Sequence, residues 1–261
     1  MAVPGRVADY DRIATGYDRR YQLHTYAGVK EALLDLLKSG TVSAALEVGC
    51  GTGHWLAEIG NATASDRMLL VGVEPAAGML AQAQATVPDA RLVRGKAEAL
   101  PWREATFDRV FCVNALHHFS DRLRFFHEAR RVLKPGGALM SIGKDPHTER
   151  DSWWVYDYFP ETLTIDRERF GQVRTLRGEL ALAGFAWAES FEADRIESVM
   201  PASDALAAGV VDAAYTSQLT VLSDDEFNAG AARIREANAA AAGQLDLVTD
   251  FRLYATVGWI E

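Results

Sequence analysis

The sequence predicts an α/β protein built on a doubly wound, mainly parallel sheet, and a glycine-rich turn is the main reason. Residues 44–56 form an apolar strand that runs into Gly49, Gly51 and Gly53 and then into a helical pattern. Glycines at alternate positions let the backbone take positive φ and let a ligand approach with no Cβ in the way. A helix that begins near Gly53 turns its free N–H groups toward that ligand. These features are typical of a nucleotide-type site at the carboxyl end of the first strand.

The spacing of these glycines argues against a dinucleotide as the ligand. The dinucleotide fingerprint requires G-x-G-x-x-G/A, but the third slot is His54 when counted from Gly49 and Leu56 when counted from Gly51. The strand instead carries Glu47 near its end, and an acidic wall would repel a diphosphate. A glycine turn with no ligand is the structural alternative.

Composition describes an ordinary globular protein that is long enough for one large α/β domain. The 261 residues are 49% hydrophobic and 24% charged, and the formal net charge is −9. Nucleic-acid-binding proteins usually present a basic surface to phosphates, so this balance favours a small-molecule substrate and no nucleic acid. The basic residues of 122–134 are interpreted as the solvated face of a helix. Whether the chain forms a homodimer is left open.

Targeting and redox features are those expected of a cytoplasmic protein. Cys50 and Cys112 fall in the glycine-rich turn and in a predicted buried strand, which is no disulfide framework. Residues 1–12 are charged early and contain no apolar signal-peptide core. No run approaches about 18 apolar residues, so no membrane span is predicted.

Residues before the glycine-rich turn predict a mobile N-terminal helix followed by a helix packed on the sheet. Apolar residues recur at helical spacing from Val29 to Leu37. They follow an aromatic-rich stretch that contains Tyr10, Tyr17, Tyr21 and Tyr26. Any one of these tyrosines has amphipathic packing as its alternative role.

The second strand, residues 68–73, ends at Glu74 and Pro75. Glu74 lies 21 positions after Gly53, about where a doubly wound site places the carboxylate that accepts both ribose hydroxyls. A helix with Met79 and Leu80 on one face follows, and Pro75 suits its first turn. We therefore interpret Glu74 as a ligand-binding residue rather than surface decoration.

Residues 44–143 resemble the core of class I S-adenosylmethionine (SAM) dependent methyltransferases, in the methyltransferase type 11 group similar to the ubiquinone and menaquinone C-methyltransferases. The run from Glu47 to Gly53 is similar to the first motif of that family, whose loop wraps the methionine part of the cofactor. Residues 91–102 resemble its Gly-Asp-Ala-Glu-x-Leu-Pro-Phe element. Three further blocks match in order: a strand at 107–114, a helix at 121–133 that stops at Lys134-Pro135-Gly136-Gly137, and a strand at 138–143.

The resemblance implies a Rossmann-like sheet of seven strands with the last strand antiparallel, and it implies S-adenosyl-L-methionine as the cofactor. The acidic wall suits its sulfonium cation. The residues expected to bind it are Tyr17, Glu47, Gly49, Cys50, Gly51, Gly53, Glu74, Pro75, Met79, Lys96, Ala97, Glu98 and Asn114.

Lys96 departs from the family pattern where the chain should hold adenine. In the family an Asp at this position accepts from the adenine amino group, whereas an ammonium only donates. Backbone groups of Ala97 or the side chain of Glu98 would have to substitute for it.

Beyond residue 143 the resemblance thins. Residues 144–170 are unusually rich in aromatic residues for a connection, 169–184 predict a helix, and 185–196 and 245–259 predict the sixth and seventh strands. The family joins those two strands by a short connection, whereas 197–243 insert about two more helices here. We read residues 1–261 as one domain with an N-terminal helical cover (1–40), a cofactor-binding core (44–143) and a helical insertion (197–243).

His117 and His118 are the candidates for a catalytic base. They follow the fourth strand on the side where the methyl group of the cofactor should point, and histidine titrates near neutrality. The alternative is that one caps the helix and the other packs against the cofactor. No metal site is expected, because adjacent histidines point apart and no spacing suggests a third ligand.

The acceptor pocket is expected to be apolar with a few polar tips. Its candidate residues are Tyr10, His147, Trp153, Tyr156 and Asp157, and Asp157 could orient a hydroxyl or an amine. Plain packing is the alternative for the aromatic rings.

The sequence thus predicts a SAM-dependent methyltransferase acting on a small, partly apolar metabolite. Two other functions stay open: a cyclase or isomerase that keeps SAM without transferring its methyl group, and a non-catalytic SAM-binding partner subunit. Residues 1–26, 147–170 and 197–243 are expected to form a cover that ligand orders over the site.

Overall fold

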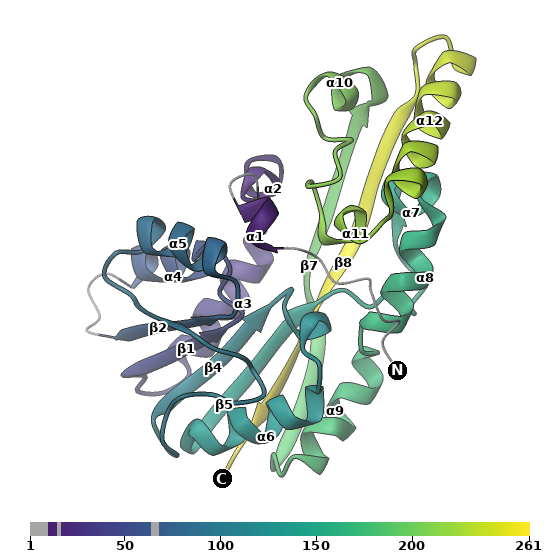
Figure 1. The fold of residues 1–261 in the computed structure, drawn as a ribbon. Coiled ribbons are helices and arrows are strands. Elements are labelled where there is room, and N and C mark those ends of the chain that lie inside the picture. The colour runs from purple at the N-terminus through teal and green to yellow at the C-terminus, as the bar shows by residue number, and fades with distance from the viewer. Residues whose placement is uncertain (1–9, 15–16, 64–67) are drawn as a thin grey trace.

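A computed structural model describes residues 10–14, 17–63 and 68–261. The expectations for residues 1–9, including most of the signal-peptide argument, lie outside the described residues. One sheet of eight strands has the order β3-β2-β1-β4-β5-β8-β6, and β7 pairs with the other edge of β8 (Figure 1). The strands are β1 Ala44–Val48, β2 Leu69–Glu74, β3 Arg91–Arg94, β4 Phe107–Val113, β5 Leu133–Gly143, β6 Ser152–Trp153, β7 Trp187–Pro201 and β8 Asp246–Trp259.

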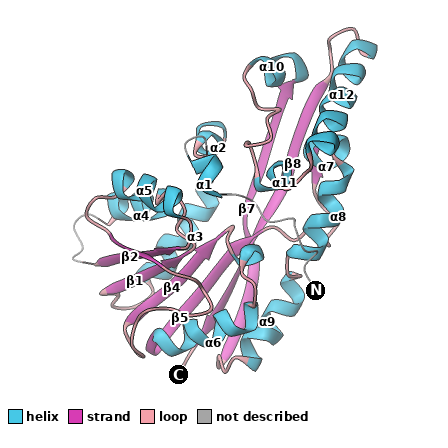
Figure 2. Cartoon of the chain, in the orientation of Figure 1, coloured by secondary structure: helices cyan, strands magenta, loops and turns pink. Residues whose placement is uncertain are grey.

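Helices surround this sheet (Figure 2). They are α1 Tyr10–Ile13, α2 Arg19–Leu23, α3 Ala27–Lys38, α4 His54–Ala62, α5 Ala77–Thr86, the 3-10 helix η2 Leu116–His118, α6 Arg122–Val132, α7 Trp154–Tyr158, α8 Pro160–Arg169, α9 Val173–Leu182, α10 Ala202–Ala207, α11 Ser217–Thr220 and α12 Asp224–Ala240. Within the described residues, no helix is both long enough and apolar enough to cross a bilayer.

The doubly wound topology is confirmed. Strands β1 to β5 are parallel, and β8 runs antiparallel to both β5 and β7. The last strand is therefore the antiparallel one, as expected. The eighth strand is the two-residue β6, which pairs with β8 and was not predicted.

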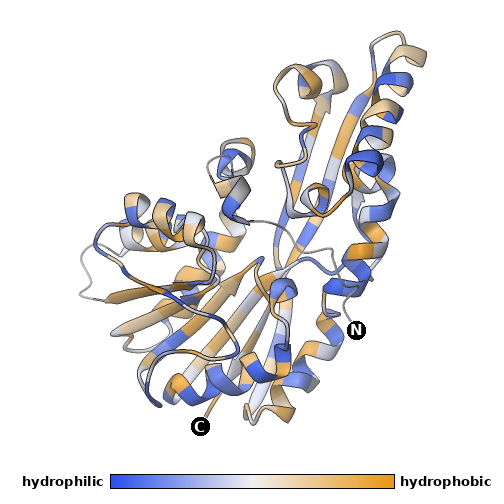
Figure 3. Cartoon of the chain, in the orientation of Figure 1, coloured by the Kyte–Doolittle hydropathy of each residue, from blue (hydrophilic) through white to orange (hydrophobic). Residues whose placement is uncertain are grey.

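Alternation along the strands divides the core between the two faces of the sheet. Leu46 and Val110 pack with α6 and α9, whereas Ala45 and Phe111 pack with α3 and α4. Because both faces are covered, the parallel strands read as continuous apolar runs. Figure 3 shows these strands mostly in orange and tan, while blue alternates with orange along the helices.

Several predicted boundaries are corrected by pairing. Strand β5 begins at Leu133 rather than 138, because Leu133 pairs with Phe107 before a register shift. Strand β7 continues to Pro201 rather than 196, because it pairs with β8 as far as Asp246. The insertion therefore starts at Ala202, and it forms three helices, α10 to α12, instead of about two.

Residues 144–170 are not the connection that was expected, since they form β6, α7 and α8. Strand β5 ends with Gly143 opposite Tyr254, and β6 resumes pairing opposite residues 249–250. Residues 251–253 of β8 therefore have no paired strand on this edge. Figure 1 shows that β7 and β8 run on beyond the parallel strands, with α10 and α12 beside their far ends.

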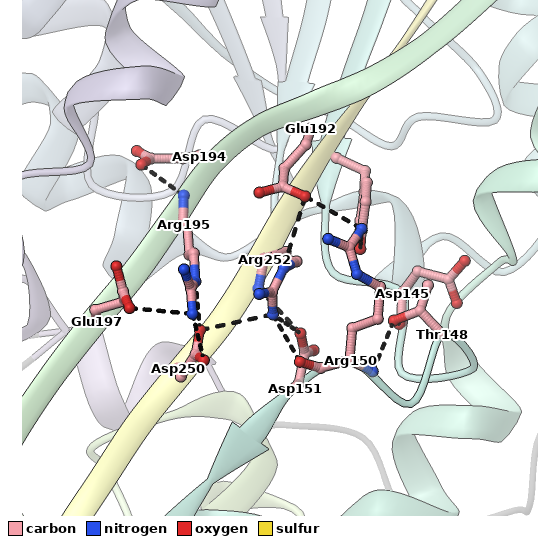
Figure 4. A network of polar contacts seen from close by, with 11 residues as sticks. Asp145, Thr148, Arg150, Asp151, Glu192, Asp194, Arg195, Glu197, Asp250 and Arg252 are labelled. Carbon is pink, nitrogen blue, oxygen red and sulfur yellow. Dashed lines mark hydrogen bonds and ion pairs between the residues drawn. The ribbon is translucent and has the colours of Figure 1, made fainter.

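A polar network closes one face of this interrupted edge (Figure 4). The Arg252 N–H donates to Asp151 Oδ1, at 3.1 Å, in place of a strand partner. The Arg252 guanidinium lies 3.6 Å from carboxylate oxygens of both Glu192 and Asp250. Side chains alternate along a strand, so Phe251 and Leu253 face the opposite side, where they join the apolar core.

Gly28 marks a close approach of α3 to the sheet. A Cβ at Gly28 would lie 2.2 Å from the backbone oxygen of Ala193, at the bulge in β7. We expect Gly28→Ala to lower the free energy of unfolding by about 1–3 kcal/mol, because backbone must shift to admit the methyl group. Urea denaturation measures this change.

Gly178→Ala is the matched control. Gly178 lies in α9, and a Cβ there would meet no atom within 4 Å. This substitution should raise the free energy of unfolding by about 0.5–1 kcal/mol, because alanine favours helix. Equal effects of the two substitutions would contradict the proposed packing of α3 on β7.

Candidate active site

A cavity of about 240 Å³ lies at the carboxyl ends of β1, β2 and β4. Every residue predicted to bind the cofactor lines it except Gly53. The cavity is also lined by Tyr21, Thr52, His54, Trp55 and Phe119, which were not predicted. Most of these have no local signal in the sequence, although Tyr21 belongs to the aromatic stretch described above.

The glycine-rich turn is anchored to the neighbouring strand. The N–H groups of Gly49 and Cys50 both donate to the Val73 carbonyl, at 2.8 and 3.2 Å. Gly49 has φ 74°, and a Cβ there would lie 2.7 Å from the Cβ of Ala115. Glycine is therefore required at this position by both conformation and space.

Gly53 lies at the start of α4, and its expected contact with the cofactor stays a prediction. It has φ 81°, caps the start of α4 and lines neither cavity described here. A Cβ at Gly53 would lie 2.9 Å from Val87 and 3.3 Å from Ala83. The absence of a side chain lets the start of α4 pack closely against α5.

Two buried carboxylates make the cavity acidic. Glu74 accepts hydrogen bonds from the N–H groups of Gly51, at 3.1 Å, and Ala76, at 3.0 Å. Glu47 is 1% exposed, and its Oε2 has no hydrogen-bond partner. Burial raises the pKa of both groups, and the charge of Glu74 raises that of Glu47 further. Neither forms an ion pair within the described residues, so a cationic ligand would complement this wall.

At the predicted adenine end of the cavity, the Glu98 carboxylate already accepts hydrogen bonds from the protein. Glu98 Oε1 accepts from the Ser120 N–H and hydroxyl, at 2.6 and 2.8 Å, and from the Asp121 N–H. Lys96 is exposed on the lining, and Ala97 is buried. Glu98 thus holds the residues that begin α6.

The N-terminal helices cover the cavity. Tyr10, Tyr17 and Tyr21 contribute to its lining. The Thr52 hydroxyl donates to Asp18, at 2.6 Å, and the Gly78 N–H donates to the Asp11 carboxylate, also at 2.6 Å. These two bonds tie the cover to the glycine-rich turn and to the start of α5.

His118 faces this cavity with both ring nitrogens engaged. Its Nε2 is hydrogen-bonded to the Tyr10 hydroxyl, and its Nδ1 lies 3.2 Å from Nη2 of Arg169. Because a guanidinium only donates, Nδ1 accepts and the neutral ring carries its proton on Nε2. Tyr10, predicted to bind substrate, is therefore placed in the larger cavity.

A second cavity, of about 60 Å³, shares Tyr17 and Asn114 with the first. Asn114 has φ 49°, a left-handed conformation that Asn tolerates better than most residues. His117 lines the second cavity and stacks on Phe170, with ring centroids 3.9 Å apart. The two adjacent histidines therefore belong to different cavities.

The structure brings only part of the predicted acceptor pocket together. Trp153 lines the second cavity, and Tyr156 lies behind it with its hydroxyl donating to Asp166, at 2.8 Å. His147 and Asp157 line neither cavity. His147 lies in a turn held by Asp145, and Asp157 is exposed on α7, so the contact of either residue with the acceptor stays a prediction. The helical phase of this segment was not predicted.

All three predicted cover segments contribute lining residues. Trp153 and Phe170 come from the aromatic segment, and residues 215–218 come from the insertion. Whether ligand orders them stays a prediction. Within the described residues, no cluster of His, Cys, Asp and Glu could hold a metal ion.

Lys144 is a site residue that the sequence reading missed. It directly follows β5, is 7% exposed and lines the second cavity. Its Nζ lies 3.6 Å from the centroid of the Trp153 ring and has no hydrogen-bond partner. The rule that identified Glu74, a polar residue at the carboxyl end of a strand, would have found it.

Burial lowers the pKa of Lys144 from 10.5 to about 8. Between those values the unfolded chain binds more protons at this lysine than the native protein, so the free energy of unfolding rises with pH. Relative to Lys144→Met, the wild-type protein should gain about 2–3 kcal/mol across this window. Urea denaturation at several pH values measures the gain, and parallel profiles for the two proteins would contradict it.

Comparison with known proteins gives consistent matches. A family model described as a methyltransferase domain matches residues 46–141. The demethylmenaquinone methyltransferase of Oceanobacillus iheyensis is 30% identical over 161 residues, which cover 58% of this chain and 67% of that protein. The phthiotriol/phenolphthiotriol dimycocerosates methyltransferase of Mycobacterium leprae is 32% identical over 51% of this chain. The match spans about half of that relative, 49% of its length.

Among solved structures, a SAM-dependent methyltransferase of Thermotoga maritima shares the fold over nearly the whole chain. The TM-score is 0.60, with 97% of this chain and 98% of the other covered, at 19% sequence identity. The shared architecture includes the region beyond residue 143, where the sequence resemblance is weak.

Proposed function

Because this chain belongs to the class I SAM-dependent methyltransferase family, in its type 11 group, we propose that it transfers a methyl group from SAM to a small, partly apolar acceptor. One observation carries the proposal. The acidic cavity on the glycine-rich turn and the second cavity beyond it share Tyr17 and Asn114. A donor in the first would therefore lie next to an acceptor in the second.

The residues present fit the cofactor. A buried carboxylate oxygen of Glu47 without a partner, together with Glu74, suits a ligand with positive charge. The turn at Gly49 and Gly51 lets backbone approach that ligand closely. In this proposal Glu74 holds the ribose, and Met79 and Ala97 flank the adenine.

SAM, when bound, would supply a methyl group that a nucleophile can attack, with the positively charged sulfur as the leaving group. The chain contributes mainly position: holding two reactants in line can supply on the order of 7–11 kcal/mol of the barrier reduction. A general base adds typically about 10²–10⁴-fold. The cover formed by Tyr10, Tyr17 and Tyr21 would exclude water from the reacting groups.

His117 is favoured over His118 as a group that acts on the acceptor. His117 lines the second cavity, where the acceptor would bind. Both ring nitrogens of His118 are engaged, by Tyr10 and Arg169, so its role here is to hold the cover.

A non-catalytic partner subunit is disfavoured by the surface of the insertion. Large apolar side chains that are well exposed occur at Leu182, Trp187 and Val199, but none of this kind lies on residues 202–245, all of which are described. A partner subunit would be expected to present such a patch there.

We expect Glu74→Ala to weaken binding of S-adenosylhomocysteine, the demethylated product, by at least about tenfold. The substitution removes charge-assisted hydrogen bonds to the ribose, worth about 1.5–3 kcal/mol each, and releases the Gly51 N–H. Calorimetry measures the affinity, with Glu31→Ala on the exposed face of α3 as the control. Unchanged affinity in Glu74→Ala would remove this residue from the site.

Incubation with methyl-labelled SAM and a metabolite extract tests the reaction itself. Label should pass to an extract component in the presence of wild-type protein. Consumption of a component without transfer of label would instead identify a SAM-retaining cyclase or isomerase. SAM binding with neither outcome would support the partner-subunit alternative.

A further inference from the structure

Lys144 lines the second cavity, beside the part of β8 that has no strand partner on this edge. It follows the last paired residue of β5, at the edge where Phe251 and Leu253 of β8 have no strand neighbour. The Nζ atom lies 3.6 Å from the Trp153 ring centroid and 4.9 Å from that of Phe251. Phe170 and Tyr215 line the same cavity. A flat, unsaturated ring would match these walls.

The carboxylates near Lys144 do not satisfy its ammonium. Asp166, from α8, is 4.0 Å away and accepts instead from the Tyr156 hydroxyl and from Gln218 Nε2, at 2.8 and 3.0 Å. Asp151 accepts from the Arg252 N–H on the other face of β8.

A second cation, the guanidinium of Arg169, lies 3.9 Å from Asp166. Lys144 and Arg169 therefore share Asp166, and neither carboxylate near Lys144 accepts a hydrogen bond from its Nζ. Lys144 is left as a buried donor with no acceptor, which is costly unless a ligand supplies one.

We propose that Lys144 binds the oxyanion of a methyl acceptor that carries an acidic hydroxyl on a flat unsaturated ring, of the phenol or enol class. The inference rests on the proposed function and assigns its substrate class. The lowered pKa of Lys144 is consistent with it, because the amine can be neutral when the acceptor arrives. The hydroxyl proton then passes to Nζ: one O–H bond breaks, one N–H bond forms, and the resulting ammonium holds the oxyanion.

4-Nitrophenol is a direct probe, since its ionised form has a distinct absorbance. Titration with wild-type protein, with and without saturating S-adenosylhomocysteine, should show that the bound probe ionises at lower pH than the free probe. Lys144→Met should bind 4-nitrophenolate about 10- to 100-fold more weakly, as expected for the loss of one charge-assisted hydrogen bond. An unchanged or raised ionisation pH in the wild-type protein would overturn the proposal without reference to any variant.

Two further ligands and one control variant complete the test. The neutral ether 4-nitroanisole should bind wild type and Lys144→Met equally. If Lys144→Met weakens the binding of benzoate more than the binding of 4-nitrophenolate, the site is one for carboxylates, and the phenol class is overturned. Lys38→Met, which changes an exposed lysine at the end of α3, should behave as wild type.

Calorimetry with S-adenosylhomocysteine keeps the two proposals separate. If Lys144→Met binds both S-adenosylhomocysteine and 4-nitrophenolate with the affinity of wild type, the role of Lys144 is rejected and the proposed function stands. Failure of wild type to bind the product would reject the proposed function itself.

Discussion

The carbonyl of Val73 is the point on which the cofactor cavity depends. It accepts from both Gly49 and Cys50, while Glu74, the next residue, accepts from Gly51. The end of β2 therefore fixes the whole glycine-rich turn of β1, and it does so with groups at the edge where a ligand binds. The turn leaves the buried carboxylate of Glu47 at the cavity wall, with its Oε2 lacking a hydrogen-bond partner.

A second constraint is the difference in length between β5 and β8. Strand β5 ends at Gly143, which pairs with Tyr254 of β8. Strand β8 begins eight residues before Tyr254, at Asp246, and this earlier part of β8 pairs with β7. The unpaired interval must be covered from elsewhere. Arg252 turns to Asp151 on one face, and Lys144, Trp153 and Phe251 leave a cavity on the other. The second cavity thus lies where β5 ends before β8 does, and the aromatic segment supplies part of its lining.

Local signals predicted the parts of the site that depend on neighbours in sequence. The glycine-rich turn and Glu74 were found because strand, turn and carboxylate follow one another along the chain. The sequence indicated that a side chain is disfavoured at Gly53, and the structure adds a reason that lies in helix packing, since a Cβ there would lie 2.9 Å from Val87.

The second cavity was harder to predict because it joins residues far apart in sequence. Gln218 and Phe251 carry no motif, and only the fold brings them to Lys144. Asp157 lines neither cavity, because it lies on helix α7 and successive residues of a helix point about 100° apart. Strand boundaries at 133 and 201 likewise depended on partners that local patterns do not reveal.

The cover over the larger cavity is attached differently from the rest of the fold. Helices α1 and α2 are short, and the side-chain bonds from Thr52 to Asp18 and from Gly78 to Asp11 join them to the turn and to α5. None of these bonds belongs to the sheet or to the main apolar core. Opening this cover would break these bonds and the stacking of Tyr21 on His54, but no hydrogen bond of the sheet. A local opening of this kind would let a spent cofactor leave without loosening the sheet.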